Sequence, residues 1–197
     1  MEIILATQNA GKLKEFNDLA KGRGLKFIPI PVEHTFPKET GRTFFENAFI
    51  KANYFFSVTG IPSLGDDSGL EVEALNGRPG IHSSRYSREG TDKSNMDKLL
   101  LELKDVQDKD RSARFKCCLV LMQNNLNEPI SAEGVVEGKI SEGKKGNKGF
   151  GYDPVFIPKG SLLHMAEIEE SEKNLISHRA NAFRSLMKKL PRGFAKE

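Results

Sequence analysis

The sequence has few cysteines and no pattern that suggests a structural metal site. Its only two cysteines, Cys117 and Cys118, are adjacent. Neighbouring strand residues point to opposite faces, so a disulfide between them would be strained. We expect core thiols of a reducing compartment, which predicts a cytoplasmic location. The four histidines and the carboxylates do not show the spacing of a structural zinc site.

The chain also lacks long hydrophobic runs and a strong excess of charge. No apolar stretch approaches the roughly 20 residues that a membrane-spanning helix needs. Residues 1–6 contain an acid and no basic residue, which favours a buried strand over a signal peptide. The net charge of +3 is small for 197 residues with 29% charged side chains. These features predict a soluble globular protein with no membrane and no nucleic-acid partner.

Hydrophobic periodicity predicts alternating strands and helices. Strands are expected at residues 2–6, 25–30, 113–122 and 130–140, the last two joined as a long hairpin through Asn124, Asn125 and Asn127. Helices are expected after Asn9, around Met96–Leu103, and between Ser177 and Pro191. No repeat or linker divides the chain, so residues 1–197 are expected to form a single domain. The mixture indicates an α/β fold with a mixed sheet.

Another helix is predicted to begin at Thr43. Thr43 and Glu46 have the spacing of a capping box, which explains Glu46 without a ligand role. The expected core-facing stripe of this helix consists of Phe45, Ala48, Phe49, Ala52 and Phe56.

Two adjacent carboxylates, Asp66 and Asp67, stand between Gly65 and Gly69. Like charges side by side are costly near a core unless a cation or strong donors offset them. A divalent cation is the common solution for carboxylate oxygens. An ordinary turn is the alternative, because Asp and Gly are also frequent turn residues.

The first strand is followed by a turn that could bind an anion. Thr7, Asn9 and Lys12 lie where a strand gives way to a helix N-terminus, whose N–H groups and dipole attract phosphate. The spacing of a Walker A loop is absent. A capped helix with a solvated lysine is the alternative interpretation.

Two later segments could contact a nucleoside. Phe150 could stack on a base and Asp153 could accept a hydrogen bond from a ring N–H, although a hairpin turn explains them equally well. Lys173 and the run Ser177-His178-Arg179 form a donor cluster near a helix start. Neither a Gly-x-Ser-x-Gly elbow nor a His-Glu-x-x-His motif is present. The combination favours a Mg²⁺-assisted reaction on a nucleotide.

In the order of these motifs, the chain resembles the inosine/xanthosine triphosphate pyrophosphatase family, the non-canonical purine NTP pyrophosphatases. The matching stretches span nearly the whole chain: Leu5–Lys12, Glu39–Gly41, Thr43–Ala48, Asp66–Leu70, Pro79–Tyr86, Gly149–Pro154 and Ile176–Arg179. Two positions depart from the family pattern: Gln8 and Lys148 each replace a usual glycine. Both changes fall in predicted loops and remove no charged group.

The resemblance implies an elongated α/β fold whose mixed sheet is flanked by helices, with a substrate cleft between two lobes, and a homodimer. It implies Mg²⁺-dependent hydrolysis of ITP, dITP and XTP to the monophosphate and pyrophosphate, which cleanses the nucleotide pool.

The resemblance also implies roles for individual residues. Asp67 would be the proton acceptor and a Mg²⁺ ligand, with Glu39 and Asp66 helping to hold the metal. The triphosphate would be held by the first turn: Thr7, Gln8, Asn9, Ala10, Gly11 and Lys12. Ser68 would touch the substrate. The nucleoside side would be lined by Phe150, Gly151, Tyr152, Asp153, Lys173, His178 and Arg179.

The sequence is also compatible with two alternative functions. One is a pyrophosphatase for other modified nucleotides. The other is a non-catalytic nucleotide- or RNA-binding module, whose basic residues would be Lys144, Lys145, Lys148, Lys188 and Lys189.

Overall fold

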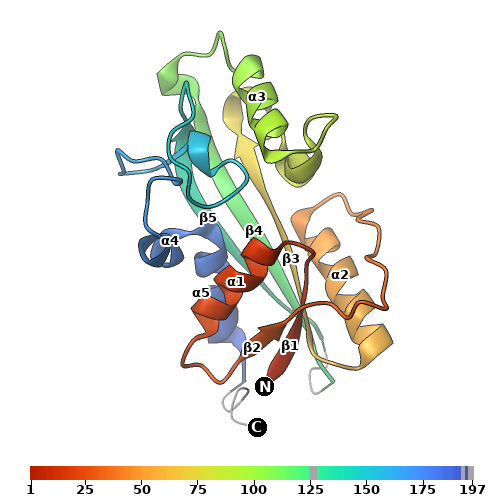
Figure 1. Ribbon diagram of the computed structural model, residues 1–197. Helices are drawn as coiled ribbons and strands as arrows, with labels where there is room; N and C mark the ends of the chain where they lie inside the picture. The colour runs from red at the N-terminus through yellow and green to blue at the C-terminus, as the bar shows by residue number, and fades with distance from the viewer. Residues whose placement is uncertain (125–127, 192–193, 195–197) are drawn as a thin grey trace. The chain divides into compact units, whose positions relative to one another are not determined.

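The computed structural model describes residues 1–124, 128–191 and 194 (Figure 1). Within these residues the sheet has the strand order β2-β1-β3-β4-β5-β6. The strands are β1 (Glu2–Ala6), β2 (Lys26–Ile28), β3 (Ser63–Val72), β4 (Ser112–Met122), β5 (Ile130–Ile140) and β6 (Phe156–Pro158). β1 pairs in parallel with β2 and β3, whereas β5 and β6 are antiparallel. The predicted mixed α/β fold is confirmed.

The described helices are α1 (Ala10–Ala20), α2 (Phe44–Thr59), α3 (Asp92–Glu102), α4 (Glu170–Ile176) and α5 (His178–Lys189). No helix within the described ranges is long and apolar enough to cross a membrane. The predicted hairpin strands are present as β4 and β5, which are neighbours in the sheet. Asn125 and Asn127, part of the expected connection, lie outside the described residues.

The chain divides into two compact units. The first contains Met1–Asp67, Cys117–Gly134 and Arg179–Glu197, and the second contains Ser68–Lys116 and Val135–His178. Strands β3, β4 and β5 each run from one unit into the other. The expectation of a single domain stays a prediction.

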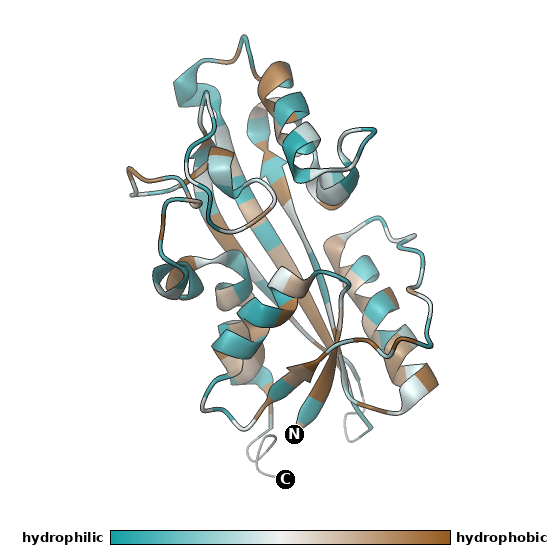
Figure 2. Cartoon of the chain, in the orientation of Figure 1, coloured by the Kyte–Doolittle hydropathy of each residue, from teal (hydrophilic) through white to brown (hydrophobic). Residues whose placement is uncertain are grey.

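The first unit has helices on both faces of its strands. Because side chains alternate along a strand, Ile3 and Leu5 of β1 pack with Phe16 of α1 and Phe183 of α5, while Ile4 packs on the other face with Phe55 of α2. Figure 1 shows α2 on the opposite side of β1 from α1 and α5. In Figure 2 most of β1 is hydrophobic, whereas the ribbon of α1 alternates between hydrophilic and hydrophobic residues.

The second unit has a separate core. Leu99 of α3, Phe115 of β4, Phe156 of β6 and Met165 belong to one buried cluster. The rings of Phe115 and Phe156 lie 4.6 Å apart between centroids. Buried Tyr152 belongs to the same cluster, so the segment that carries Phe150 and Asp153 is anchored in this core.

The predicted core-facing stripe of α2 is partly wrong. Phe45 is 43% exposed and stacks on Phe49, with ring centroids 6.3 Å apart. The buried face is instead made of Phe44, Asn47, Ala48, Lys51, Ala52 and Phe55. A prediction from apolar residues alone places the buried face of α2 wrongly. Two of its inward positions, Asn47 and Lys51, hold polar side chains that bind carboxylates of the first unit.

The acidic pair lies inside strand β3, not in a turn. Gly65 precedes it because the strand approaches α2 closely: a Cβ on Gly65 would lie 1.9 Å from the carbonyl oxygen of Ala48. Any side chain there would push the helix away from the strand. Glycine at this position therefore sets the packing that holds Asp66 and Asp67 in place.

Local capping agrees with the sequence at two helix starts. The Asn9 side chain accepts a hydrogen bond from the Lys12 N–H, and Thr43 Oγ1 accepts one from the Glu46 N–H. The reciprocal half of the expected capping box differs, because Glu46 accepts from the Arg42 N–H. Cys117 and Cys118 are buried thiols that form no disulfide, as expected of core residues.

Candidate active site

Asp66 lies at the centre of a buried cluster of charges in the first unit. Its side chain has no exposed surface, and its Oδ2 lies 2.7 Å from the Lys12 ammonium and 3.7 Å from Nε of Arg179. The Cys117 thiol donates to Oδ1 at 3.3 Å. Arg179 is held in turn by Glu15, at 3.2 Å. Two cations therefore converge on one carboxylate.

These cations decide the ionisation of Asp66. Burial alone would raise the pKa of the Asp66 carboxyl, but the charges of Lys12, Arg179 and Lys51 outweigh it and hold the pKa far below its ordinary value of 3.8. Asp66 is thus a fixed negative charge that positions Lys12 and Arg179.

Asp67 has a different environment. Its Oδ1 lies 3.2 Å from the Lys51 ammonium, and its Oδ2 accepts from the Asn47 amide at 3.2 Å. The same ammonium lies 2.6 Å from Oε1 of Glu39. Lys51 therefore bridges Glu39 and Asp67, two of the three carboxylates that the resemblance implies as metal ligands.

The pKa of Asp67 is displaced in the opposite direction from that of Asp66. Burial raises the pKa of the Asp67 carboxyl, and the nearby charges of Glu39 and Asp66 raise it further, while Lys51 and Lys12 offset only part of this effect. A carboxylate whose pKa is raised toward neutrality is a better proton acceptor than an ordinary aspartate. The adjacent pair is thus divided into one fixed charge and one candidate base.

The predicted anion-binding turn is ordered by its own side chains. Thr7 Oγ1 accepts from the Asn9 N–H, and the Asn9 side chain caps α1. Gln8, Asn9, Ala10 and Gly11 are exposed, and Lys12 leads from them toward Asp66. The start of α1 therefore presents N–H groups at the surface of the first unit, beside a lysine held in place.

The second unit brings together three of the residues expected near the nucleoside. Asp153 Oδ2 accepts from the Lys173 ammonium at 2.5 Å and from the Phe150 N–H at 2.9 Å. The same ammonium lies 5.2 Å from the centroid of the Phe150 ring, in cation–π range. Gly149, at φ +74°, permits this arrangement, because a Cβ there would lie 2.0 Å from Asp153 Oδ2.

The remaining candidates of this unit are spread over several environments. Tyr152 is buried and donates its hydroxyl to the Ser83 carbonyl, so it anchors the segment from within the core. The Gly151 N–H donates to Asp92 Oδ2. His178 is buried and stacks on Phe115, with centroids 4.8 Å apart. Ser68 continues β3 directly after Asp67.

Three placements differ from the sequence-based picture. Arg179 was expected on the nucleoside side, but it contacts Asp66 and Glu15 in the first unit. Lys51 and Asn47 were not singled out, although both contact Asp67. A polar pair spaced four residues apart on an otherwise apolar helix face is the signal that could have found them.

A Mg²⁺ ion fits part of the predicted ligand set. Glu39 and Asp67 share one cation, so two carboxylates are close enough to act together. Proteins commonly hold Mg²⁺ through one or two carboxylates plus substrate phosphates. Asp66 fits poorly, because both of its oxygens already have donors. No group of three His, Cys, Asp or Glu residues in the described ranges could hold a metal.

Comparison with known proteins shows the family. Residues 3–189 match the Ham1 family. A dITP/XTP pyrophosphatase of Coxiella burnetii is 44% identical over 98% of both chains, and one of Vibrio cholerae is 46% identical over 95% of both. A Staphylococcus aureus Ham1 structure superimposes with a TM-score of 0.84 at 37% identity, covering 95% of this chain and 97% of that one.

These relatives confirm the predicted enzyme class: a nucleotide pyrophosphatase, which hydrolyses an acid anhydride, built on a mixed α/β fold. The chain belongs to the Ham1 family.

Proposed function

We propose that this protein hydrolyses non-canonical purine nucleoside triphosphates, dITP, ITP and XTP, to the monophosphate and pyrophosphate. The observation that carries the proposal is the division of the acidic pair: Asp66 fixed as an anion by Lys12 and Arg179, and Asp67 with a raised pKa beside Glu39 and Lys51. The names of the relatives supply the substrate class.

In the proposed reaction, a water molecule attacks the α-phosphorus and Asp67 accepts its proton. The bond from the α-phosphorus to the oxygen that bridges to the β-phosphorus breaks, and pyrophosphate leaves with that oxygen. Lys12 and Arg179, positioned by Asp66, would balance the charge on the phosphates. Glu39 and Asp67 would hold Mg²⁺, which supplies positive charge against the phosphate oxygens when bound.

General-base help is worth on the order of 10²- to 10⁴-fold. Most of the acceleration must therefore come from positioning and from the electrostatics of the cations. Lys51 would act as a positioning residue, because it fixes Glu39 and Asp67 relative to one another.

Recognition of the base is proposed to involve Phe150, Asp153 and Lys173. A donor directed at the purine 6-oxo group would be left unpaired against the 6-amino group of adenine, which discriminates strongly. The Lys173 ammonium, which lies over the Phe150 ring, would be such a donor. A homodimer in the cytoplasm remains part of the proposal.

The test is a pyrophosphate-release panel over ITP, dITP, XTP, GTP and ATP, with and without Mg²⁺. Preferred release from the first three, only with Mg²⁺, is expected. A preference for dUTP or 5-methyl-UTP in the same assay would instead favour a pyrophosphatase for other modified nucleotides.

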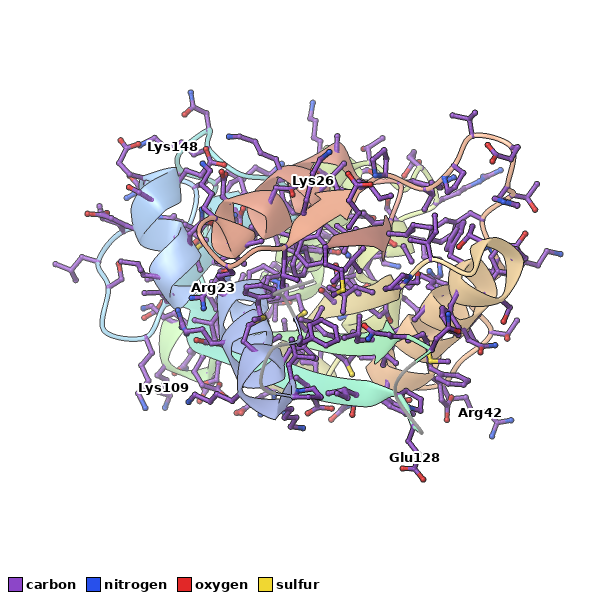
Figure 3. All side chains as sticks on the ribbon, turned by 90° about the horizontal axis from the view of Figure 1, so that it is seen from below. Arg23, Lys26, Arg42, Lys109, Glu128 and Lys148 are labelled. Carbon is purple, nitrogen blue, oxygen red and sulfur yellow. The ribbon has the colours of Figure 1, made fainter. Side chains whose placement is uncertain are left out.

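The RNA-binding alternative has little support. Lys144 pairs with Asp97, and Lys148 pairs with Glu169. Figure 3 shows Arg42 at the opposite side of the first unit from Arg23. Two of the five lysines of this alternative are therefore neutralised, and Arg23 and Arg42 are not gathered on one face as a nucleic-acid surface requires.

A further inference from the structure

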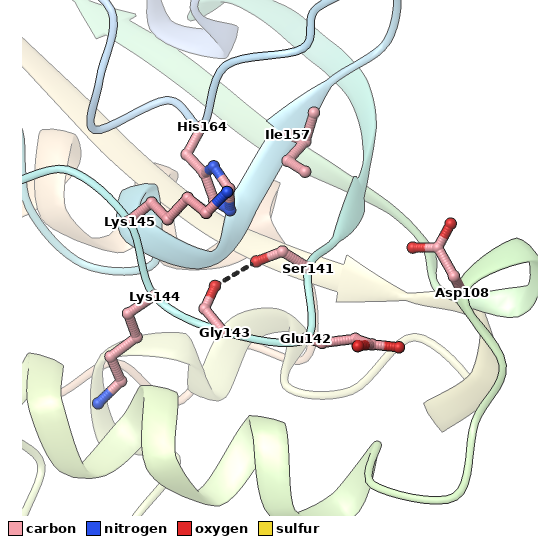
Figure 4. A pocket seen from close by; sticks show the side chains of 8 residues that line it. All are labelled: Asp108, Ser141, Glu142, Gly143, Lys144, Lys145, Ile157 and His164. Atoms are coloured by element: carbon pink, nitrogen blue, oxygen red, sulfur yellow. Dashed lines mark hydrogen bonds between the residues drawn. The ribbon is translucent and has the colours of Figure 1, made fainter.

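The second unit contains a cavity that the proposed reaction does not use. It has a volume of about 420 Å³ and lies between the Ser141–Lys145 segment, Ile157 of β6 and His164 (Figure 4). This volume falls within the range of about 300–1,000 Å³ that is typical of small-molecule sites. None of the residues assigned to the reaction lines it.

His164 is the unusual member of the lining. It is 4% exposed, and its Nδ1 lies 3.0 Å from Oε2 of Glu167, which also accepts the His164 backbone N–H. The carboxylate fixes the ring so that Nδ1 carries a proton. The other nitrogen, Nε2, is buried and has no hydrogen-bond partner among the described residues. A buried polar atom without a partner is costly and calls for a ligand.

Lys145 supplies a positive charge at the same end of the cavity. Figure 4 shows its side chain extending toward the His164 ring. Its backbone is held by a hydrogen bond from its N–H to the Pro154 carbonyl. Lys144 pairs with Asp97, whereas Lys145 makes no ion pair with any described residue. Its charge acts on the Glu167 carboxylate, but no ion pair within the described ranges holds the ammonium, which can therefore turn toward an anion.

The opposite end of the cavity limits the size of that anion. Asp108 and Glu142 both line it, and they lie away from Lys145 in Figure 4. Asp108 is neutralised by Lys139, with contacts of 2.6 and 2.8 Å, but Glu142 contributes a negative charge. A long polyanion would meet this charge, whereas a single phosphate group at the Lys145 end would meet only Glu167, whose carboxylate is hydrogen-bonded to His164 and offset by the charge of Lys145.

We infer that this cavity is a second binding site, for one phosphate group, held by Lys145 and His164. Phosphate suits His164 in either protonation state: a P–OH group can donate to neutral Nε2, and a phosphate oxygen can accept from the imidazolium. Inorganic phosphate and a phosphomonoester share this chemistry. The inference does not depend on the proposed hydrolysis, since its residues are different.

The test follows the imidazole signals of His164 by ¹H–¹⁵N NMR while inorganic phosphate is added at constant ionic strength. This readout is specific to the cavity, even if phosphate also binds the turn before α1. A saturable change of the Nε2 signal is expected. Lys145→Met should weaken the binding about tenfold, as expected for a lost charge-assisted hydrogen bond. Lys159→Met, an exposed lysine of the same unit, is the matched control and should change nothing.

A second variant should change the affinity for phosphate in the opposite direction. Glu142→Gln removes a like charge and should tighten phosphate binding about 1.5- to 5-fold. Titration with ribose 5-phosphate and with pyrophosphate separates the ligand sources: a monoester that binds more tightly than phosphate points to a phosphorylated metabolite. No change at His164, equal affinity in Lys145→Met, or tighter binding of pyrophosphate than of phosphate would overturn the inference.

Discussion

The ammonium of Lys51 lies 3.2 Å from the Asp67 carboxylate, and both side chains are buried in the first unit. Burial lowers the pKa of Lys51, but the charges of Asp67, Glu39 and Asp66 outweigh it and keep the pKa above its ordinary value. The lysine therefore remains charged. Lys51 therefore links helix α2 to the carboxylate of Asp67, the candidate base.

We expect Lys51→Met to destabilise the fold strongly. The substitution leaves the buried Asp67 and the half-buried Glu39 without their shared cation, and removing one partner of a buried ion pair costs about 3–5 kcal/mol. Urea unfolding at pH 7 measures the loss. Lys21→Met, which removes a lysine paired with Asp18 at the surface, should cost less than about 1 kcal/mol. Similar values for the two variants would show that the Lys51 bridge contributes nothing.

The stabilising effect of Asp66 should depend on pH in a defined direction. Its folded-state pKa lies below the unfolded value near 3.8, so its contribution is fully present above that value and is lost as pH falls below it. The difference in unfolding free energy between the wild type and Asp66→Asn should be constant from about pH 7 to 5. It should shrink below pH 4. A difference that grows on acidification would contradict the assignment of Asp66 as a fixed anion.

Gly65→Ala should disturb the site through packing alone. The added methyl group meets the backbone of Ala48, which cannot move without shifting α2. Overpacking of this kind typically costs about 1–3 kcal/mol, and activity should fall because α2 carries Lys51. Gly143→Ala is the control, since nothing lies within 4 Å of its new Cβ. Thermal unfolding of both variants decides the point, and equal melting temperatures would exclude a role for the close approach.

Local signals predicted the fold well, and buried polar contacts were predicted poorly. Asn9 and Thr43 cap helices as their residue types and spacing indicate. The buried face of α2 differs from the predicted one because Lys51 and Asn47 point inward. A search for apolar residues does not assign polar side chains to a buried face. Their inward positions depend on Asp67, which is 16 and 20 residues away in sequence.

Arg179 illustrates the same limit. It follows His178 in sequence, yet His178 packs in the second unit and Arg179 contacts Asp66 in the first. Adjacent residues of one motif are expected to contribute to the same site. The boundary between the two units falls between these two residues. No periodicity in the sequence indicates which side chain contacts a carboxylate so distant along the chain.

Asp67→Asn should reduce turnover by at least about 100-fold, because it removes the proton acceptor. The fold should persist, since the amide can still accept a hydrogen bond from Asn47 and Lys51 keeps its ion pair with Glu39. Asp110→Asn, at an exposed position, is the matched control. Near-normal turnover in the Asp67 variant would remove this residue from the role of base.

In the proposed reaction, water attacks the α-phosphorus of the nucleotide. Hydrolysis of dITP in ¹⁸O-labelled water, with the products separated and analysed by mass spectrometry, shows which phosphorus is attacked. We expect one labelled oxygen in the nucleoside monophosphate and an unlabelled pyrophosphate. Label in the pyrophosphate, or release of orthophosphate with a nucleoside diphosphate, would contradict attack at the α-phosphorus.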